Sequence, residues 1–232
     1  MPRCSAINEM LSSTVYTGYF IVGSSLSQVN IHILARSLKR KQTSDSSIIS
    51  ESQFRDQAAG GFFAALYKHR KFNLHVLAFR GTQALSVMDW LNNFGQGLGV
   101  KAPQYDAAIT LATFVKGNIK GTFMLTGHSL GGGMASAAGL VSNTNTVVFN
   151  PAGVNKRTLP AGINFAAADS LVTSYVVKGE ILDYAQNGGL PTGVVAPDSV
   201  GRRIVLPSTF MFHSILHQID LHSMDSVLGA GQ

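Results

Sequence analysis

Residues 125–136 read LTGHSLGGGMAS and place four glycines around one serine, Ser129. The segment follows an apolar run, GTFML, that predicts a strand, and it leads into small residues that predict a helix from about Leu130. Gly127 and Gly131 flank the serine at two residues' distance. A tight strand-to-helix turn needs small residues at both positions, because larger side chains would collide there. The segment therefore predicts a nucleophile elbow, which presents a serine hydroxyl above the edge of a sheet.

A phosphate-binding loop is another glycine-rich turn that joins a strand to a helix. It requires the pattern GxxxxGK followed by Ser or Thr. No lysine follows the glycines of residues 125–136. A glycine-rich loop with an incidental serine is the other alternative, and the predicted strand and helix on either side favour the elbow over both.

Strand and helix patterns alternate around the elbow. Residues 61–81 predict two strands joined at a basic turn over residues 68–71. Further strands are predicted by GTFMLTG, NTVVFN, SYVVKG and RRIVLP, and a helix is predicted by PQYDAAITLATFVKG. Strands that alternate with helices indicate an α/β fold, in which a mostly parallel sheet has helices on both faces. The leading hairpin makes the predicted sheet mixed.

Residues 1–50 predict a helical and linker segment that leads into a domain over residues 51–232. The segment SQVNIHILARSLKRK has helical spacing and ends in basic residues, and QTSDSSIISES predicts a polar loop. TVYTGYFIVG has the outline of a signal peptide, but Thr and Gly interrupt it and no cleavage site is clear. No run has the roughly 18 apolar residues of a membrane-spanning helix.

Composition limits the classes of partner. The chain has 232 residues, of which 45% are hydrophobic, enough for one domain with a large core. Its single cysteine, Cys4, excludes a disulfide framework, and no Cys or His cluster has metal-ligand spacing, so we expect no metal and no cofactor. A net charge of +6 favours anionic surfaces. No basic stretch is interleaved with aromatic residues, so nucleic acid is not an expected partner.

The segment GHSLGG, together with the upstream VLAFRGT, resembles the class 3 lipases of the α/β-hydrolase fold from about Gly61 onward. FRGT, DWLNN, FNPAG and HSMDSVL resemble bacterial phospholipase-type members, including antibacterial effectors of type VI secretion. The first fifty residues lie outside this resemblance. It implies a lipid or phospholipid substrate, transient contact with a membrane surface, and a secretion apparatus or an immunity protein as partners. It also implies secretion, or delivery to the periplasm or membrane surface of a target cell.

The resemblance further implies an oxyanion site. Thr82 would lie in the oxyanion loop and contribute its N–H beside that of Leu130. Thr82 directly follows a predicted strand, at the edge where α/β sites lie. The segment QALSVMDWLNNFGQGLG, from residue 83, corresponds to the family's lid region. A mobile lid and a packed helix around Trp90 both remain open.

The predicted strand SYVVKG is followed by two candidate acids. In this fold the acid follows the nucleophile and precedes the histidine. Position at the strand end favours Glu180, although the family usually has Asp there, and Asp183 is the alternative. Asp169 and Asp198 are weaker candidates.

Three histidines follow the acid, namely His213, His217 and His222. His222 precedes SMDSVL, which resembles the family's final histidine segment, and it is therefore the predicted base. His128, inside the elbow, is expected to be packed.

The expected reaction is hydrolysis of carboxylic esters of lipids through an acyl-enzyme, by a phospholipase or lipase that acts at membranes. A triacylglycerol lipase and a soluble carboxylesterase are alternatives of the same class. An inactive hydrolase-fold module that binds membranes or a partner is the alternative of another class. The set of Ser129, Glu180 or Asp183, and His222 favours the enzyme.

Overall fold

A computed structural model provides the structure of the chain. It describes residues 48–56, 62–69, 73–81, 103–156, 159–187, 196–208, 215–223 and 226–227, and two short strands at 15–16 and 19–20. These two strands, β1 (Val15–Tyr16) and β2 (Tyr19–Phe20), form a small antiparallel pair. Among the described residues, no helix is both long enough and apolar enough to span a bilayer.

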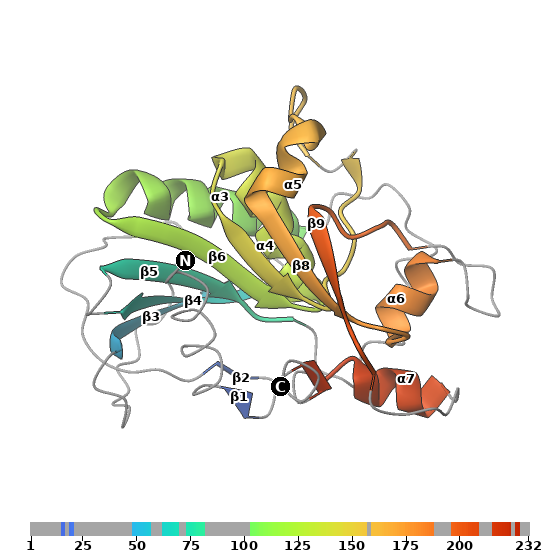
Figure 1. The fold of residues 1–232 in the computed structure, drawn as a ribbon. Coiled ribbons are helices and arrows are strands. Elements are labelled where there is room, and N and C mark those ends of the chain that lie inside the picture. Colours follow the sequence, from blue (N-terminus) through green and yellow to red (C-terminus); the bar gives the residue numbers. More distant parts are fainter. Residues whose placement is uncertain are drawn as a thin grey trace.

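A seven-stranded sheet forms the centre of the fold, in the order β3-β4-β5-β6-β7-β8-β9 (Figure 1). The pairs β3–β4 and β4–β5 are antiparallel, and every later pair is parallel. The strands are β3 (Ile48–Asp56), β4 (Phe62–His69), β5 (Leu74–Phe79), β6 (Thr122–His128), β7 (Thr146–Phe149), β8 (Val172–Val177) and β9 (Arg202–Leu206).

Helices α3 (Pro103–Asn118) and α4 (Leu130–Ser142) pack together on one face of the sheet (Figure 1). Helix α3 begins with proline, which is favourable at a first helical position because its missing N–H would have no intrahelical partner. Helix α4 consists of small residues over most of its length, and residues 130–140 are all buried. Its small side chains allow close contact with both α3 and the sheet.

The opposite face has its own apolar cluster. Phe63, Val76 and Phe149 belong to it, and so do Leu221 and Val227 from the C-terminal part of the chain. Leu221 is the last residue of α7 (Ile215–Leu221). Elements on both sides of the sheet thus contribute to the core. Three further short helices lie in the described part of the chain, namely the 3-10 turn η3 (Phe165–Ala167), α5 (Ala168–Leu171) and α6 (Ile181–Gln186).

The predicted α/β fold with a mostly parallel, mixed sheet is confirmed, including the leading hairpin and the helix at 103–118. The predicted polar loop QTSDSSIISES is wrong in its second half, because residues 48–52 are the first part of β3. Strand β3 pairs along its length with β4, and these backbone hydrogen bonds stabilise a polar sequence as a strand. The helix predicted over residues 27–41 lies outside the described residues. The domain division at residue 50 stays a prediction.

Candidate active site

The elbow is formed where β6 ends and α4 begins. Ser129 has φ 58° and ψ −129°, a positive-φ conformation outside the αL region that costs a non-glycine residue free energy. It occupies the N-cap position of α4, yet its hydroxyl makes no capping hydrogen bond, unlike most serines at this position. The backbone N–H of Ser129 donates to the carbonyl of Phe149 (3.1 Å), and its carbonyl accepts from Gly133 and Ala152. The surrounding backbone therefore holds the serine in a strained geometry.

The glycines on both sides of the serine are required by close approach. A Cβ on Gly127 would lie 2.3 Å from the carbonyl oxygen of Gly131. A Cβ on Gly131 would lie 2.2 Å from the carbonyl oxygen of Phe79 and 2.8 Å from the backbone nitrogen of Gly81. All three distances are below van der Waals contact, so any side chain at Gly127 or Gly131 would force the turn open. The same contacts place the end of β5 directly against the elbow.

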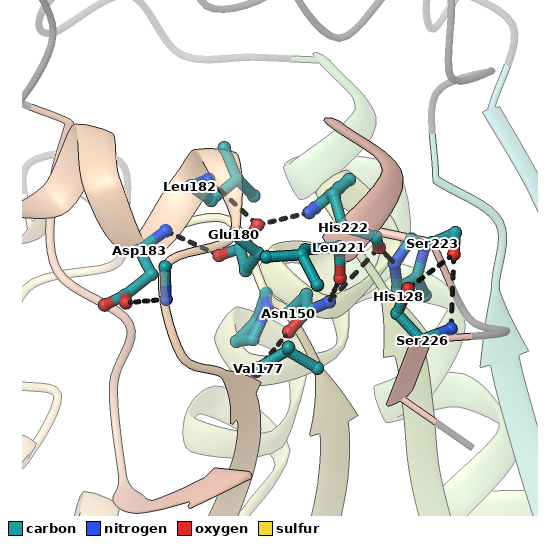
Figure 2. Close-up of polar contacts among 12 residues, drawn as sticks. His128, Asn150, Val177, Glu180, Leu182, Asp183, Leu221, His222, Ser223 and Ser226 are labelled. Carbon is teal, nitrogen blue, oxygen red and sulfur yellow. Dashed lines mark hydrogen bonds and ion pairs between the residues drawn. The ribbon is translucent and has the colours of Figure 1, made fainter. Parts of the chain in front are cut away.

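Glu180 lies at the end of the turn after β8 and caps helix α6. Its side chain accepts hydrogen bonds from the backbone N–H of Leu182 (2.9 Å) and of Asp183 (2.5 Å). The carboxylate also accepts from Nδ1 of His222 at 2.5 Å (Figure 2). Glu180 is only 1% exposed. Three N–H donors therefore enclose a carboxylate that water does not reach.

His222 follows the last residue of α7 and is 3% exposed. Because a carboxylate can only accept, the proton of a neutral His222 ring must be on Nδ1. This leaves Nε2 with its lone pair. That nitrogen is buried and has no hydrogen-bond partner among the described residues. One ring nitrogen is thus held by Glu180, and the other is free to accept a proton. A histidine in this arrangement can act as a general base.

His128, the residue before Ser129, lies against the base. The two imidazole rings have centroids 4.7 Å apart, and Nε2–H of His128 donates to the backbone carbonyl of His222 (2.6 Å) (Figure 2). Burial and, to a smaller extent, the nearby His222 together lower the pKa of His128 to about 3. His128 is therefore neutral at physiological pH. The ring contact also brings His222 next to the elbow.

Asp183, the alternative acid, is used elsewhere. One oxygen accepts from the backbone N–H of Gly179 (2.8 Å), and the other accepts from the side chain of Asn187 (2.8 Å). Arg203 of β9 forms an ion pair with the same carboxylate. These contacts hold the turn between β8 and α6 and join it to the edge strand. Asp169 is in α5 and Asp198 precedes β9, and within the described residues neither forms a hydrogen bond or ion pair with His222.

Some predicted site residues cannot be located. Thr82, the segment at 83–98 and His213 lie outside the described residues, as does the side chain of His217. Leu130 is the first residue of α4, so its backbone N–H has no carbonyl partner inside the helix. Within the described ranges, no group of three His, Cys, Asp or Glu side chains is placed to hold a metal ion.

One polar residue at the same sheet edge was not predicted. Asn150 directly follows β7 and is fully buried, and its side chain contacts the backbone of both Val177 and His222 (Figure 2). The sequence does contain a signal for Asn150, because in NTVVFNPAG it is a polar residue directly after an apolar strand. Site residues collect at the carboxyl ends of parallel strands.

The sheet order and the strained serine turn are those of an α/β hydrolase. The family model of the phospholipase-like, Tle-like phospholipase domain matches residues 8–205. The chain belongs to this family, which confirms the predicted resemblance to bacterial phospholipase-type lipases. The match also differs in extent from that resemblance, because it includes most of the first fifty residues and ends at residue 205, before His222.

The chain is 36% identical over 155 residues to the extracellular phospholipase A1 of Serratia liquefaciens. The aligned region covers 64% of this chain and 46% of the relative, so the chain spans less than half of that protein's length. Among solved structures, a triacylglycerol lipase from Penicillium expansum has a TM-score of 0.48 at 15% identity, over 70% of this chain and 71% of that one. A Rhizomucor miehei lipase propeptide complex has a TM-score of 0.44 at 13% identity, over 69% and 56%.

Proposed function

We propose that the chain is a serine hydrolase that cleaves carboxylic esters of lipids at membranes. Ser129 is the nucleophile, His222 the general base and Glu180 the acid that orients the base. The observation that carries this proposal is the 2.5 Å contact between Nδ1 of His222 and Glu180, which leaves Nε2 unpartnered beside the elbow. Membership of a phospholipase family supports it independently.

The reaction proceeds in two halves. Nε2 of His222 takes the proton from the hydroxyl of Ser129 as its oxygen bonds to the ester carbonyl carbon. The tetrahedral intermediate collapses, the alcohol leaves with the proton from His222, and an acyl-enzyme remains. His222 then deprotonates a water molecule, which attacks the acyl-enzyme. The fatty acid leaves and Ser129 regains its proton.

The oxyanion of each intermediate is bound by backbone N–H groups. We assign one donor to Leu130, whose N–H opens α4, where the helix dipole also favours negative charge. We assign the second to Thr82, the residue after Gly81. The close approach of Gly81 to Gly131 supports this assignment.

The proposed substrate is a phospholipid in a membrane. The Serratia relative is described as an extracellular phospholipase A1, and the chain has a net charge of +6. Each Lys or Arg near an anionic bilayer contributes about 1 kcal/mol to binding. Arg202 is exposed on β9, the last strand of the described sheet, whereas the neighbouring Arg203 is paired with Asp183.

The experiment is product analysis by mass spectrometry with vesicles of mixed bacterial phospholipids, at low and high salt. We expect free fatty acid and lysophospholipid, with less release at high salt because screening weakens the attraction to the bilayer. A triacylglycerol emulsion and a soluble short-chain ester are run in parallel. Turnover confined to these two would contradict the phospholipase proposal and leave the serine hydrolase in place.

The matched variants are Ser129→Ala and Ser136→Ala. Ser136 is also a buried serine of the same segment, and its hydroxyl donates only to the carbonyl of Gly132 (2.8 Å). We expect Ser129→Ala to lower turnover by about 10⁴-fold or more and Ser136→Ala to keep most of it. A fluorophosphonate probe should label the parent protein and not Ser129→Ala. Hydrolysis retained by folded Ser129→Ala would remove the proposal, and a folded parent protein without any turnover would favour an inactive binding module.

We also propose that the chain acts outside the cytoplasm that produces it, by secretion or by delivery to the periplasm or membrane surface of a target cell. A secretion apparatus or an immunity protein is then its partner. The description of the Serratia relative as extracellular and the Tle-like name of the family support this. Fractionation of producing and recipient cells tests it, and confinement to the producer's cytoplasm would contradict it.

A further inference from the structure

Asn150 is a buried side chain in an unusual backbone conformation. It follows β7 with φ 39°, in the left-handed region that Asn tolerates better than most residues. Its backbone N–H donates to the carbonyl of Tyr175 (2.8 Å) in the neighbouring strand β8. Its exposure is 0%, so its amide group makes its hydrogen bonds entirely within the protein.

The Asn150 amide joins two parts of the chain that are far apart in sequence (Figure 2). Its Oδ1 accepts from the backbone N–H of Val177, at the end of β8 (2.9 Å). Its Nδ2 donates to the backbone carbonyls of His222 (3.1 Å) and Leu221 (3.3 Å). Both hydrogens of the amide thus have an acceptor, and its oxygen has a donor.

The two ends of this bridge lead to the two partners of the buried ion pair. Val177 lies three residues before Glu180, and the turn between them is closed by a hydrogen bond from the N–H of Glu180 to the carbonyl of Val177 (3.2 Å). At the other end Asn150 holds the carbonyl of His222 itself. Oδ1 and Nδ2 belong to one rigid amide group. Because each atom is hydrogen-bonded to a different backbone, the amide limits the distance between the backbones that carry Glu180 and His222.

We propose that Asn150 is a positioning residue, which sets the alignment of His222 with Glu180 through their backbones and does not touch the substrate. This inference rests on the proposed role of His222 as the base. Misplacement of a catalytic group by about 1 Å costs about 10²-fold in rate. His128 donates to the same carbonyl, so this oxygen keeps one hydrogen-bond donor when Asn150 is replaced. The contacts between the strands of the sheet are also kept.

Two substitutions separate positioning from general stability. Asn150→Asp keeps the shape and the acceptor for Val177, but it turns a carboxylate oxygen toward the carbonyl of His222. Asn150→Gly removes the side chain and accepts the positive φ without strain. Ser174→Ala is the matched control, because Ser174 is also buried in this sheet and its hydroxyl donates to a distant carbonyl, that of Val200 (2.9 Å).

The first measurement is steady-state kinetics on a soluble ester, with melting temperatures for each variant. We expect both Asn150 variants to lower kcat by about 10²-fold with KM nearly unchanged, since alignment matters in the transition state and not for ground-state binding. Ser174→Ala should keep the kcat of the parent protein. An equal loss of kcat in Ser174→Ala at the same melting temperature would overturn the inference.

The second measurement is the low-field proton NMR resonance of Nδ1–H in His222, which reports the short hydrogen bond to Glu180. It should move or broaden in Asn150→Asp and Asn150→Gly and stay in place in Ser174→Ala. An unchanged resonance and kcat in folded Asn150→Asp would overturn the inference. The resonance needs no turnover, so an inactive parent protein would contradict the proposed function while Asn150 is still tested. If Asn150→Gly does not fold, both measurements are made on Asn150→Asp, which has nearly the same shape as the parent protein at this position.

Discussion

The ring of His128 donates a hydrogen bond to the backbone carbonyl of His222, at 2.6 Å. One of these residues precedes the strained serine in the elbow, and the other is the proposed base. The contact therefore joins the elbow to the C-terminal part of the chain without involving either residue's reactive atoms. A neutral ring is suited to this role, because only Nε2 needs to carry a proton.

His128 should make the protein less stable in acid. Burial lowers its pKa from 6.5 to about 3, so between these two values the unfolded chain binds a proton that the folded protein does not. The free energy of unfolding then falls as the pH falls through this window, by at most about 1.4 kcal/mol per pH unit from this group. Urea unfolding from pH 7 to pH 4 measures the slope.

The comparison for this prediction is His128→Gln, which retains an N–H donor and does not titrate. Its stability at pH 7, where His128 is neutral, is the reference. Below that pH its curve should be flatter than that of the parent protein. Parallel curves for the two proteins would show that His128 is not the group responsible.

Glu180 and Asp183, the two carboxylates after β8, should have different roles, one in activity and the other in stability. Glu180→Gln removes the negative charge that orients His222, and we expect kcat to fall by up to about 10⁴-fold. Asp183→Asn breaks the ion pair with Arg203 and should lower the melting temperature while most of the activity remains. Kinetics on a short-chain ester, with thermal unfolding, distinguishes them. A larger loss of kcat in Asp183→Asn would reassign the acid.

Among the histidines after the acid, only His222 should be essential. His222→Ala removes the base and should match the loss seen for Ser129→Ala, because members of one catalytic unit are not additive. His213→Ala and His217→Ala should keep most of the activity. The double variant Ser129→Ala/His222→Ala should be no worse than either single one. A full loss from His213→Ala would move the base to that residue.

Substitution of a glycine should destabilise the protein at the elbow and not at an open helical position. Gly131→Ala places a Cβ 2.2 Å from the carbonyl oxygen of Phe79, and overpacking of this kind costs about 1–3 kcal/mol or more. Gly117→Ala is the control, because a Cβ there meets nothing within 4 Å and lies in helix α3. It should stabilise the protein by up to about 1 kcal/mol. Equal melting temperatures for the two variants would contradict the elbow geometry.

The sequence predicted the elements whose pattern is local. The strand-to-helix turn around Ser129 follows from residue size, and the parallel strands follow from their continuous apolar runs. Strand β3 was not predicted, and its residues 48–52 were assigned to a loop, because it pairs on one side only within the described sheet and such a strand does not need an apolar pattern. Its backbone pairing with β4 is a tertiary effect.

The choice between Glu180 and Asp183 shows why site residues are harder to predict. They lie three residues apart, and in the sequence only the position at the end of the predicted strand favours Glu180. The start of α6 gives them different contacts, because Glu180 caps the helix and contacts His222 while Asp183 contacts Arg203, and these contacts support Glu180 as the proposed acid. Asn150 was missed for a related reason, since its role depends on residues that are far away in sequence.

The apolar contacts of Leu221 and Val227 on the second face of the sheet have a consequence for when the protein can be active. Ser129 and Glu180 belong to consecutive units between β6 and α6, whereas His222 joins them only when the segment that contains α7 docks. Local opening of such a segment requires less free energy than unfolding the sheet. Activity through the proposed triad should therefore be lost when this segment opens, before the sheet unfolds. A chain still emerging from the ribosome would lack the proposed base, and with it the proposed hydrolysis, until this segment docks.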